Sequence, residues 1–464
     1  MVEQQNLDYL REEMQNITNQ IIKLVHDRME VAKKIGNIKQ QLKIEIEDEK
    51  VEHDIKKTVL KLTKDIGMDV EFSGRLLNLL LSESVRLQNV QNNSNKSSTH
   101  IAIFMKAKEL EKTGKKIIHM EVGEPDYPPP LKVKEELAKI YDNKRYHYTE
   151  ISGLPQLRQA ISQKFSNIVP EQVLVTPGGR FAVFCAISSL LKSGDELINI
   201  EPSWPAYKEC ADFIGAKTRV LKTTLEDKWV PNLKMLENLI NINTKMIIIN
   251  YPNNPTGKIL DSQLLEKIVS IAREYNLFIL SDEVYSDYSF GKYNSILDYQ
   301  YDKSIMVSSF SKTYGMTGFR VGYGIGNKSI ISQMRKVQAT AITSVAEPMQ
   351  YSALGAIGND IQGNIDSIQS RINLICKRLK QMKTEFIVPN GAMYVFPKIL
   401  TKNYSDDISL VYDLLEHGVA IAPGSGFGNS YKKFIRISAC QSSKLLNAGL
   451  DILENTLNKE IKQI

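Results

Sequence analysis

Apolar residues near the start of the chain recur at intervals of three or four positions, the spacing of one face of an α-helix. The first run is Leu7, Leu10, Met14, Ile17, Ile21 and Leu24, and the second is Val31, Ile35, Ile38 and Leu42. Together they predict one long helix over residues 7–42. Two further helices are expected over about residues 47–66 and 71–90.

The predicted first helix would be roughly 50 Å long, at ~1.5 Å per residue. The rest of a small domain cannot cover that length, so we expect it to pack against a second copy of the chain, giving at least a homodimer. Arg28 occupies the seam position between Leu24 and Val31. A cation there either extends its charged end to solvent or points inward and serves a function.

Later in the chain, apolar runs of strand length alternate with helical patterns. The predicted strands are 173–176, 245–250, 277–280 and 304–307, and the predicted helices are 181–191 and 264–275. Near-continuous apolar strands separated by helices are typical of a mostly parallel sheet that is buried on both faces. Polar groups follow the strand ends, where α/β sheets bind ligands. The sequence therefore predicts an all-α domain followed by an α/β domain.

Proline usage marks the boundary between these domains. All 16 prolines come after residue 91, and residues 91–99 form a polar run rich in asparagine and serine. A run of that kind indicates a linker. We predict a helical domain over residues 1–91, a linker over 92–99 and a second domain over 100–464.

Composition excludes several classes of protein. Hydrophobic residues make up 42% of the 464 positions and charged residues 24%, as in ordinary globular proteins. The net charge of +6, without clustered basic and aromatic residues, argues against nucleic-acid binding. We found no signal peptide or apolar run of membrane-spanning length, so no membrane association is expected. The scattered cysteines and histidines favour free thiols in a reducing cytoplasm and no metal site.

Lys312 lies in a loop rich in serine and glycine, directly after the predicted strand 304–307. A lysine there can form an imine, while the nearby hydroxyl groups and Arg320 can hold a phosphate. This combination indicates pyridoxal phosphate chemistry; the alternative is a solvated lysine in a surface loop. Gly178 and Gly179 stand between a strand and a helix, where free N–H groups also suit a phosphate.

Polar residues recur on the predicted helices of the first domain. Arg28 and Lys39 are eleven positions apart, about three turns, and therefore share a face. Arg11 lies off that face and could serve the pocket of a partner. Two pairs have i,i+4 spacing, Asp48 with Glu52 and Ser84 with Gln88. Such a set would suit a small dianion that carries a hydroxyl group.

In these residues, their order and their spacing, residues 7–91 resemble the all-helical class of chorismate mutase. The resemblance implies an intertwined dimer of three-helix chains. It implies that Arg28, with Arg11 of the partner, binds the two substrate carboxylates. Lys39 and Gln88 would hydrogen-bond the ether oxygen, and Glu52 the ring hydroxyl.

Asp48 and Ser84 would line the same pocket. The reaction is an intramolecular rearrangement, so the protein needs only to hold the reactive conformer and stabilise charge on the ether oxygen. The family usually has an arginine just before the position of Glu52, where this chain has Val51. The alternative is a dimerisation domain that has lost catalysis.

Residues 100–455 resemble the class I aminotransferases of pyridoxal phosphate fold type I, with a large domain and a small α+β domain. The resemblance implies that Lys312 bonds the cofactor and moves the proton. Asp282 would pair with the pyridinium nitrogen, and Tyr285 and Asn254 would hydrogen-bond the ring oxygen. Trp204 would stack on the ring.

The resemblance also implies contacts at the two ends of the cofactor and substrate. The groups expected around the phosphate are Gly178, Gly179, Ser309, Arg320 and, from the other subunit, Tyr148. Arg436 would bind the substrate α-carboxylate through a bidentate pair. Gly123 would let the backbone approach the same carboxylate.

The preferred substrate is less constrained. Arg180 follows the two glycines where related enzymes often have a lysine that binds a distal carboxylate; it could instead contact the phosphate or form an ion pair. Because chorismate mutase makes prephenate, we expect transamination of prephenate, phenylpyruvate or 4-hydroxyphenylpyruvate, with aspartate or glutamate as donor. The alternatives are a general aspartate aminotransferase, a pyridoxal phosphate lyase and an aminotransferase-like regulator.

Overall fold

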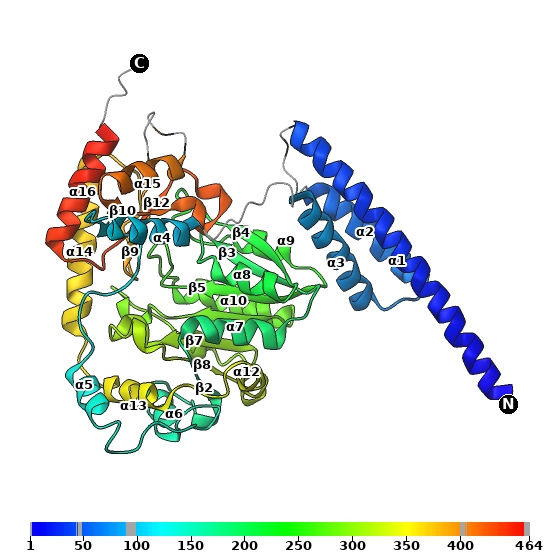
Figure 1. Cartoon of the computed structure of the whole chain (residues 1–464), viewed down its shortest axis with the longest axis horizontal. Helices are drawn as coiled ribbons and strands as arrows, with labels where there is room; N and C mark the ends of the chain where they lie inside the picture. Colours follow the sequence, from blue (N-terminus) through cyan, green and yellow to red (C-terminus); the bar gives the residue numbers. More distant parts are fainter. Residues whose placement is uncertain are drawn as a thin grey trace. The chain divides into compact units, whose positions relative to one another are not determined.

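The computed structural model describes residues 2–42, 44, 49–89, 99–399, 404 and 406–458. The chain forms two compact units. The first consists of helices α1 (Val2–Leu42), α2 (Glu49–Asp65) and α3 (Val70–Asn89) (Figure 1). All three predicted helices are confirmed. Asp48 and the predicted linker, apart from Thr99, lie outside the described residues.

The two halves of α1 have different surroundings. Helix α3 packs against both α1 and α2, and buries Ala32 in the second half of α1. The apolar stripe is nevertheless exposed along both halves, from 42% at Ile35 to 68% at Leu24. A single copy of this unit therefore leaves one apolar stripe uncovered, as expected if a second copy packs there.

The second unit is built on a seven-stranded sheet in the order β2-β8-β7-β6-β5-β3-β4. Its strands are β2 (Val173–Thr176), β3 (Glu196–Glu201), β4 (Lys217–Lys222), β5 (Thr244–Asn250), β6 (Phe278–Asp282), β7 (Ser304–Ser309) and β8 (Gly322–Gly326). All neighbours are parallel except β8, which is antiparallel to both β2 and β7. The predicted mostly parallel sheet is confirmed, and β3, β5, β6 and β7 end at the same edge.

Both faces of this sheet are buried. Along β5, Met246 and Ile248 join a core with α7 (Gly179–Leu190) and α12 (Lys328–Ala341). Ile247 and Ile249 alternate with them and join a core with α10 (Ser262–Glu274) on the other face. The remaining helices around the sheet include α5 (Leu131–Ala138), α6 (Pro155–Ser162), α8 (Ala206–Phe213), α9 (Leu233–Leu239) and α13 (Glu347–Ala356).

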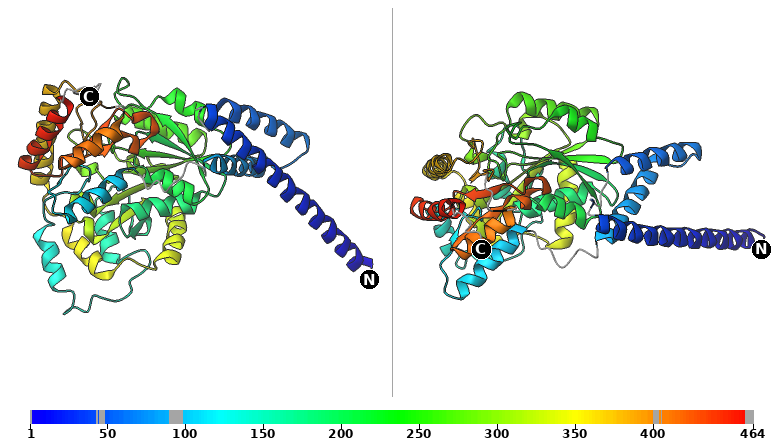
Figure 2. Two further views of the ribbon diagram at one scale, coloured as in Figure 1. Left: turned by 45° about the horizontal axis from the view of Figure 1, so that its top comes forward. Right: turned by 90° about the horizontal axis from the view of Figure 1, so that it is seen from above.

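A smaller α+β layer completes the second unit. Its sheets are β11-β12-β9, from Ala422–Pro423, Ile435–Ser438 and Tyr394–Val395, and the pair β1 (Ile118–His119) with β10 (Val419–Ala420). Helices α4 (Thr99–Lys112), α14 (Gln362–Gln381), α15 (Asp407–Glu416) and α16 (Ser443–Asn458) pack around them. Figure 2 shows α15 and α16, in orange and red, at one end of the unit. None of the described helices is long and apolar enough to cross a membrane.

Candidate active site

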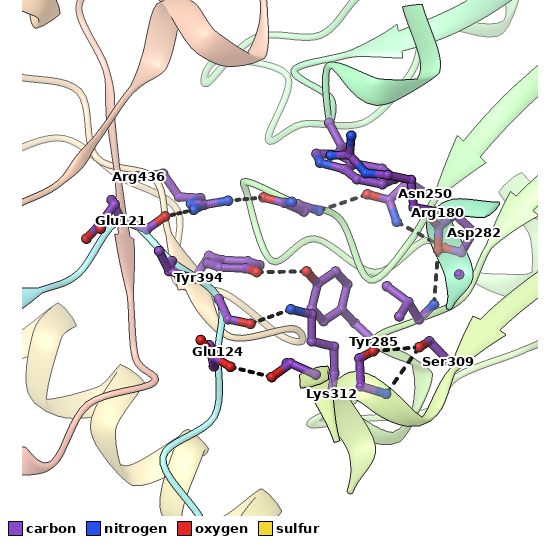
Figure 3. Close-up of a pocket in the computed structure, with 18 of the residues that line it drawn as sticks. Glu121, Glu124, Arg180, Asn250, Asp282, Tyr285, Ser309, Lys312, Tyr394 and Arg436 are labelled. Carbon is purple, nitrogen blue, oxygen red and sulfur yellow. Dashed lines mark hydrogen bonds between the residues drawn. The ribbon is translucent and has the colours of Figure 1, made fainter. Parts of the chain in front are cut away.

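A pocket of ≈ 400 Å³ opens where the large sheet meets the smaller layer (Figure 3). One wall comes from the ends of β5, β6 and β7, and the other from β9, β12 and the loop after β1. The predicted residues that line it are Gly123, Gly179, Arg180, Trp204, Asn254, Asp282, Tyr285, Ser309, Lys312, Arg320 and Arg436. Residues spread over three hundred positions of sequence thus meet in one cavity.

Lys312 lies in the short helix α11 (Phe310–Thr313), directly after β7. The Ser309 hydroxyl caps this helix by accepting from the Ser311 N–H at 3.1 Å. The Lys312 amine donates to the Gly123 carbonyl oxygen. Burial lowers the pKa of the Lys312 amine because a low dielectric disfavours the charged form. Burial therefore shifts this amine toward its neutral, nucleophilic form.

Asp282 ends β6 and is 4% exposed. Its carboxylate accepts hydrogen bonds from the Tyr207 hydroxyl at 2.7 Å and the Val284 N–H at 3.2 Å. Burial nevertheless raises the pKa of Asp282 to about 6. A cation placed against this carboxylate would stabilise its ionised form. A protonated ring nitrogen is such a cation.

The opposite end of this wall suits a phosphate. Gly178 has a φ of 86°, and an ideal Cβ there would lie 2.6 Å from Nη2 of Arg320. Gly178 caps α7 without a side-chain hydrogen bond, so the first N–H groups of that helix stay available. Arg320 and the buried Ser309 flank them. The arrangement fits a phosphate dianion.

Arg436 of β12 stands at the other side of the pocket and is 5% exposed. Its Nη1 donates to Oδ1 of Asn254 at 2.9 Å, and its Nη2 to the Glu121 carbonyl. Its Nε is buried and has no hydrogen-bond partner in the described part of the chain. Arg436 lines the pocket, and its Nη1 and Nη2 groups have further N–H donors beyond these two bonds, which suits a substrate carboxylate.

In the helical unit, Arg28 points inward rather than to solvent. It donates to the Leu80 carbonyl at 2.7 Å and to the Ser84 hydroxyl. Burial lowers its pKa, and within the described residues both partners are uncharged. One turn beyond Ser84, the Oε1 atom of Gln88 is buried and lacks a partner among the described residues. The Arg28 guanidinium has more N–H donors than these two bonds use, which suits an anionic ligand, whereas the Gln88 Oε1 atom can only accept a hydrogen bond.

The other predicted residues of this unit differ in their exposure to solvent. Lys39 and Glu52 are half-buried. Arg11 lies on the first half of α1 and pairs with Asp8 at 3.2 Å, a position from which it could serve the pocket of a second copy. Val51 is 52% exposed.

Comparison with known proteins assigns each of the two units to a family. Residues 115–453 match the family model for aminotransferase class I and II, and residues 10–89 match that for chorismate mutase type II. The chain belongs to the class I and II aminotransferases. Its helical unit is a chorismate mutase domain, so the protein carries an isomerase and a transferase on one chain.

The aminotransferase unit aligns with known relatives over most of their length. An aspartate aminotransferase from Thermotoga maritima is 35% identical over 76% of this chain and 94% of its own. An aspartate/prephenate aminotransferase from Thermus thermophilus is 29% identical over 78% and 97%. The crystal structure of a Thermotoga maritima aspartate aminotransferase has a TM-score of 0.75 at 34% identity, covering 79% of this chain and 98% of its own. As a member of this family, the present chain uses pyridoxal 5′-phosphate, and the pocket described above fits that cofactor.

Arg180 lies at the edge of the aminotransferase pocket, on the side away from Arg436 (Figure 3). Its guanidinium stacks over the Trp204 ring, 4.6 Å from the ring centre. It also lies 3.7 Å from the carboxylate of Glu209, with 49% of its side chain exposed. The structure thus combines two of the predicted options, an ion pair and a position from which Arg180 can reach a ligand.

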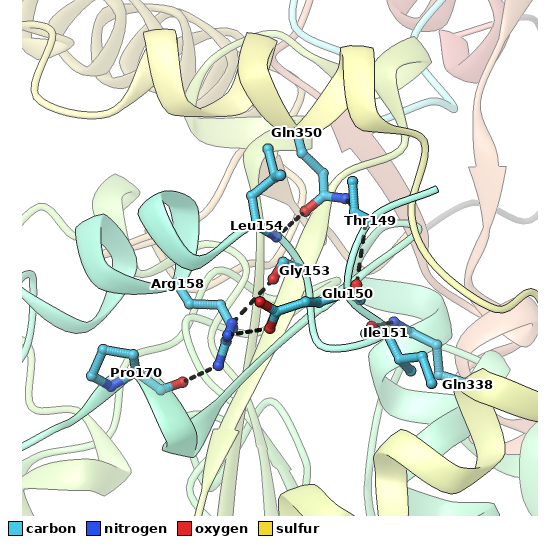
Figure 4. A network of polar contacts seen from close by, with 9 residues as sticks. All are labelled: Thr149, Glu150, Ile151, Gly153, Leu154, Arg158, Pro170, Gln338 and Gln350. Atoms are coloured by element: carbon cyan, nitrogen blue, oxygen red, sulfur yellow. Dashed lines mark hydrogen bonds and ion pairs between the residues drawn. The ribbon is translucent and has the colours of Figure 1, made fainter. Parts of the chain in front are cut away.

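Tyr148 is not brought to the pocket within one chain and is 90% exposed. The segment after it is firmly anchored (Figure 4). Gln350, fully buried on α13, accepts from the Leu154 N–H at 2.7 Å and donates to the Thr149 hydroxyl at 2.9 Å. An exposed tyrosine beside an anchored backbone agrees with the prediction that it serves another subunit.

Sequence reasoning missed three residues of the aminotransferase pocket: Asn250, Tyr207 and Tyr394. Asn250 donates to the Asp282 carbonyl at 3.0 Å, and its position at a strand end could have indicated it. Tyr207 is three residues after Trp204, in the first turn of α8, a weaker signal. Tyr394 contacts Tyr285 from 109 residues away, and no local pattern pointed to it.

Proposed function

We propose that this chain joins two steps of aromatic amino-acid synthesis. The helical unit would convert chorismate to prephenate, and the aminotransferase unit would transfer an amino group from aspartate or glutamate to prephenate or to an aromatic 2-keto acid. One observation carries this proposal: Arg436 and Arg180 stand on opposite sides of one pocket, in a chain whose other domain makes a keto acid with two carboxylates.

The lining of the pocket between these cations supports the same choice. Phe104, Val122 and Phe427 contribute apolar surface, which suits the carbon ring of such a substrate. The Thermus thermophilus relative is named for both aspartate and prephenate, and such a dual preference requires a pocket that accepts a dicarboxylate and a ring. Arg436 would hold the carboxylate that every substrate shares, and Arg180 the second one.

The chain's own groups have separate tasks in the transfer. Bound pyridoxal phosphate supplies an electron sink for the carbanion formed at the substrate. Asp282 would keep the ring nitrogen protonated. Lys312, whose pKa burial lowers, would move the proton at the reacting carbon. Arg436 would orient that carbon toward the lysine amine.

The mutase reaction would need positioning rather than proton transfer. Arg28 of one chain and Arg11 of a second would hold the two carboxylates in the reactive conformer. Lys39 and Gln88 would stabilise the charge that develops on the ether oxygen, with Glu52, Ser84 and Asp48 around them. Both sites then need at least a homodimer. The four buried free cysteines lead us to place the protein in the reducing cytoplasm.

Competition between keto acids tests the transamination step. The purified protein would receive aspartate or glutamate as donor, and prephenate, phenylpyruvate, 4-hydroxyphenylpyruvate and oxaloacetate as competing acceptors. We expect the highest kcat/KM for prephenate or one of the two aromatic acids. Inert prephenate together with dominant oxaloacetate would instead establish a general aspartate aminotransferase, the function suggested by the names of several relatives.

Chorismate consumption tests the other unit. Arg28→Ala should lower the rate by at least a hundredfold, because a buried charge-assisted contact to a substrate carboxylate contributes several kcal/mol. Arg86→Ala is the matched control, since Arg86 is exposed on α3 and pairs only with Glu83. Equal rates for the two variants would show that the mutase site does not include Arg28.

A further inference from the structure

Tyr394 lies between two groups that handle different parts of the reactants. It belongs to β9, is 1% exposed and lines the pocket. Its hydroxyl is 2.7 Å from the Tyr285 hydroxyl. Its ring lies under the Arg436 guanidinium, 4.3 Å from ring centre to Cζ. In Figure 3, Tyr285 lies beside Tyr394, joined to it by a dashed line, and Arg436 lies above the Tyr394 ring.

The contact between the two hydroxyl groups limits where their hydrogens point. Only one hydrogen can lie between two oxygens 2.7 Å apart. When Tyr394 supplies it, the Tyr285 oxygen is an acceptor there and its own hydrogen is directed elsewhere. Either hydroxyl can donate in this bond, and an acceptor in the pocket beside Tyr285, such as the cofactor ring oxygen, would select the arrangement in which Tyr394 donates. Tyr285 then becomes a donor into the pocket.

The ring of Tyr394 constrains Arg436 in the same way. The guanidinium is fixed by Asn254 at one end and by the Tyr394 ring from below. A cation over an aromatic face is stabilised, the more so when both are buried. Gly123 makes this arrangement possible, because a Cβ at Gly123 would collide with the Tyr394 hydroxyl. The absent side chain at Gly123 thus serves Tyr394 directly.

We propose that Tyr394 is a positioning residue that couples the two sides of the pocket, its hydroxyl directing the Tyr285 hydrogen toward the cofactor ring oxygen and its ring holding Arg436 for the substrate carboxylate. This inference rests on the proposed function, since it assumes that cofactor and amino acid occupy this pocket together. The two roles reside in different atoms of one side chain and can be separated by substitution.

Tyr394→Phe removes the hydroxyl alone. The hydrogen bond that the cofactor ring oxygen accepts from Tyr285 would then weaken. Its loss favours the protonated form of the bound cofactor. We expect the pH midpoint of its visible absorption band to rise by about one unit, a tenfold change in proton affinity, while the KM for aspartate stays within about twofold. The other titratable groups near these tyrosines, Arg436, Asp282 and Cys440, are unchanged in the variant.

Tyr394→Leu removes the ring as well. We expect the same shift of the absorption midpoint, and in addition a dissociation constant for the unreactive dicarboxylate maleate about tenfold higher, because Arg436 loses its support. Tyr301→Phe is the matched control. Its hydroxyl donates to the Ala272 and Leu277 carbonyls away from the pocket, so its loss should lower thermal stability and leave the absorption midpoint in place.

Each result decides one part of the inference. An absorption midpoint in Tyr394→Phe equal to that of the wild type overturns the role of the hydroxyl. Maleate binding in Tyr394→Leu equal to that of the wild type overturns the role of the ring. A wild-type protein that binds the cofactor but aminates no keto acid contradicts the proposed function instead, and the absorption titration still decides on Tyr394.

Discussion

The Tyr207 hydroxyl donates a 2.7 Å hydrogen bond to Oδ2 of Asp282, and both residues are buried. Burial raises the pKa of Asp282 to about 6, and this bond opposes the rise because it stabilises the ionised carboxylate. Tyr207 comes from α8 and Asp282 from the end of β6, so the contact joins a helix to the sheet beneath it. Its purpose is to keep the Asp282 carboxylate charged where a cationic ring nitrogen will bind.

Tyr207→Phe should weaken cofactor binding. Hydrogen bonds to charged groups contribute about 1.5–3 kcal/mol, so the dissociation constant for pyridoxal phosphate should rise at least tenfold. Equilibrium dialysis of the cofactor measures it. Tyr431→Phe is a suitable control, because that hydroxyl is also buried but bonds to the Thr223 carbonyl outside the pocket. An unchanged constant in Tyr207→Phe would mean that Asp282 needs no help from this hydroxyl.

Without cofactor, Asp282 should make the protein less stable as the pH rises. Its pKa is raised from 3.8 to about 6 in the folded state. Between these values the unfolded chain loses the proton and the folded protein keeps it, so the free energy of unfolding falls as the pH rises, by about 3 kcal/mol in total. Asp282→Asn removes this contribution. Cofactor-free Asp282→Asn should therefore match the wild type near pH 4 and exceed its stability at pH 7.

Denaturant unfolding at both pH values checks this, and added pyridoxal phosphate provides the internal comparison. The cofactor should stabilise the wild type strongly at pH 7 and the variant much less, because only Asp282 can pair with the ring nitrogen. Parallel stability curves for the two cofactor-free proteins would show that Asp282 ionises at its ordinary pKa.

Local sequence patterns predicted four of the seven strands of the large sheet, β2, β5, β6 and β7. They also placed Lys312 in a polar loop directly after one of these strands, where α/β sheets bind ligands, whereas the site roles of Asp282 and Ser309 came from the resemblance to class I aminotransferases. Tyr394 and Tyr207 could not be found in this way. They reach their partners through the packing of the smaller layer and of α8, which depends on contacts 109 and 75 residues apart.

Arg180→Met should separate substrates by the number of their carboxylates. The side chain keeps its apolar length over Trp204 but loses its charge, so the KM for aspartate and prephenate should rise about tenfold or more while that for phenylpyruvate changes little. Steady-state kinetics with the three substrates measures this difference. Glu209→Gln is the control, because it removes the ion-pair partner of Arg180 and leaves the cation in place. An equal rise for all three substrates would assign Arg180 to the phosphate.

Gly36→Ala should disturb the mutase unit alone. An ideal Cβ at Gly36 would lie 3.0 Å from the Cα of Gln88, so α1 and α3 would have to separate at the crossing where Gln88 faces the proposed pocket. We expect chorismate turnover to fall at least tenfold, with aspartate transamination unchanged. Gly363→Ala offers a control in a helix with open space around the added methyl group. Full mutase activity in Gly36→Ala would mean that the close approach of these helices is not needed for catalysis.

Gln350→Leu should release the segment beside Tyr148 (Figure 4). The buried amide of Gln350 accepts from the Leu154 N–H and donates to the Thr149 hydroxyl and, at 2.8 Å, to the Val345 carbonyl. Leucine leaves these groups unpaired, at about 1–3 kcal/mol each, so the free energy of unfolding should fall by at least 2 kcal/mol. Faster hydrogen exchange at the Leu154 amide would report the local release.

If Tyr148 reaches the phosphate of another subunit, cofactor affinity should fall as well. Gln362→Leu removes only an exposed bond to Asp366 and should change none of these quantities measurably. Loss of stability in Gln350→Leu with unchanged cofactor affinity would show that the anchored segment supports the fold and not the neighbouring site.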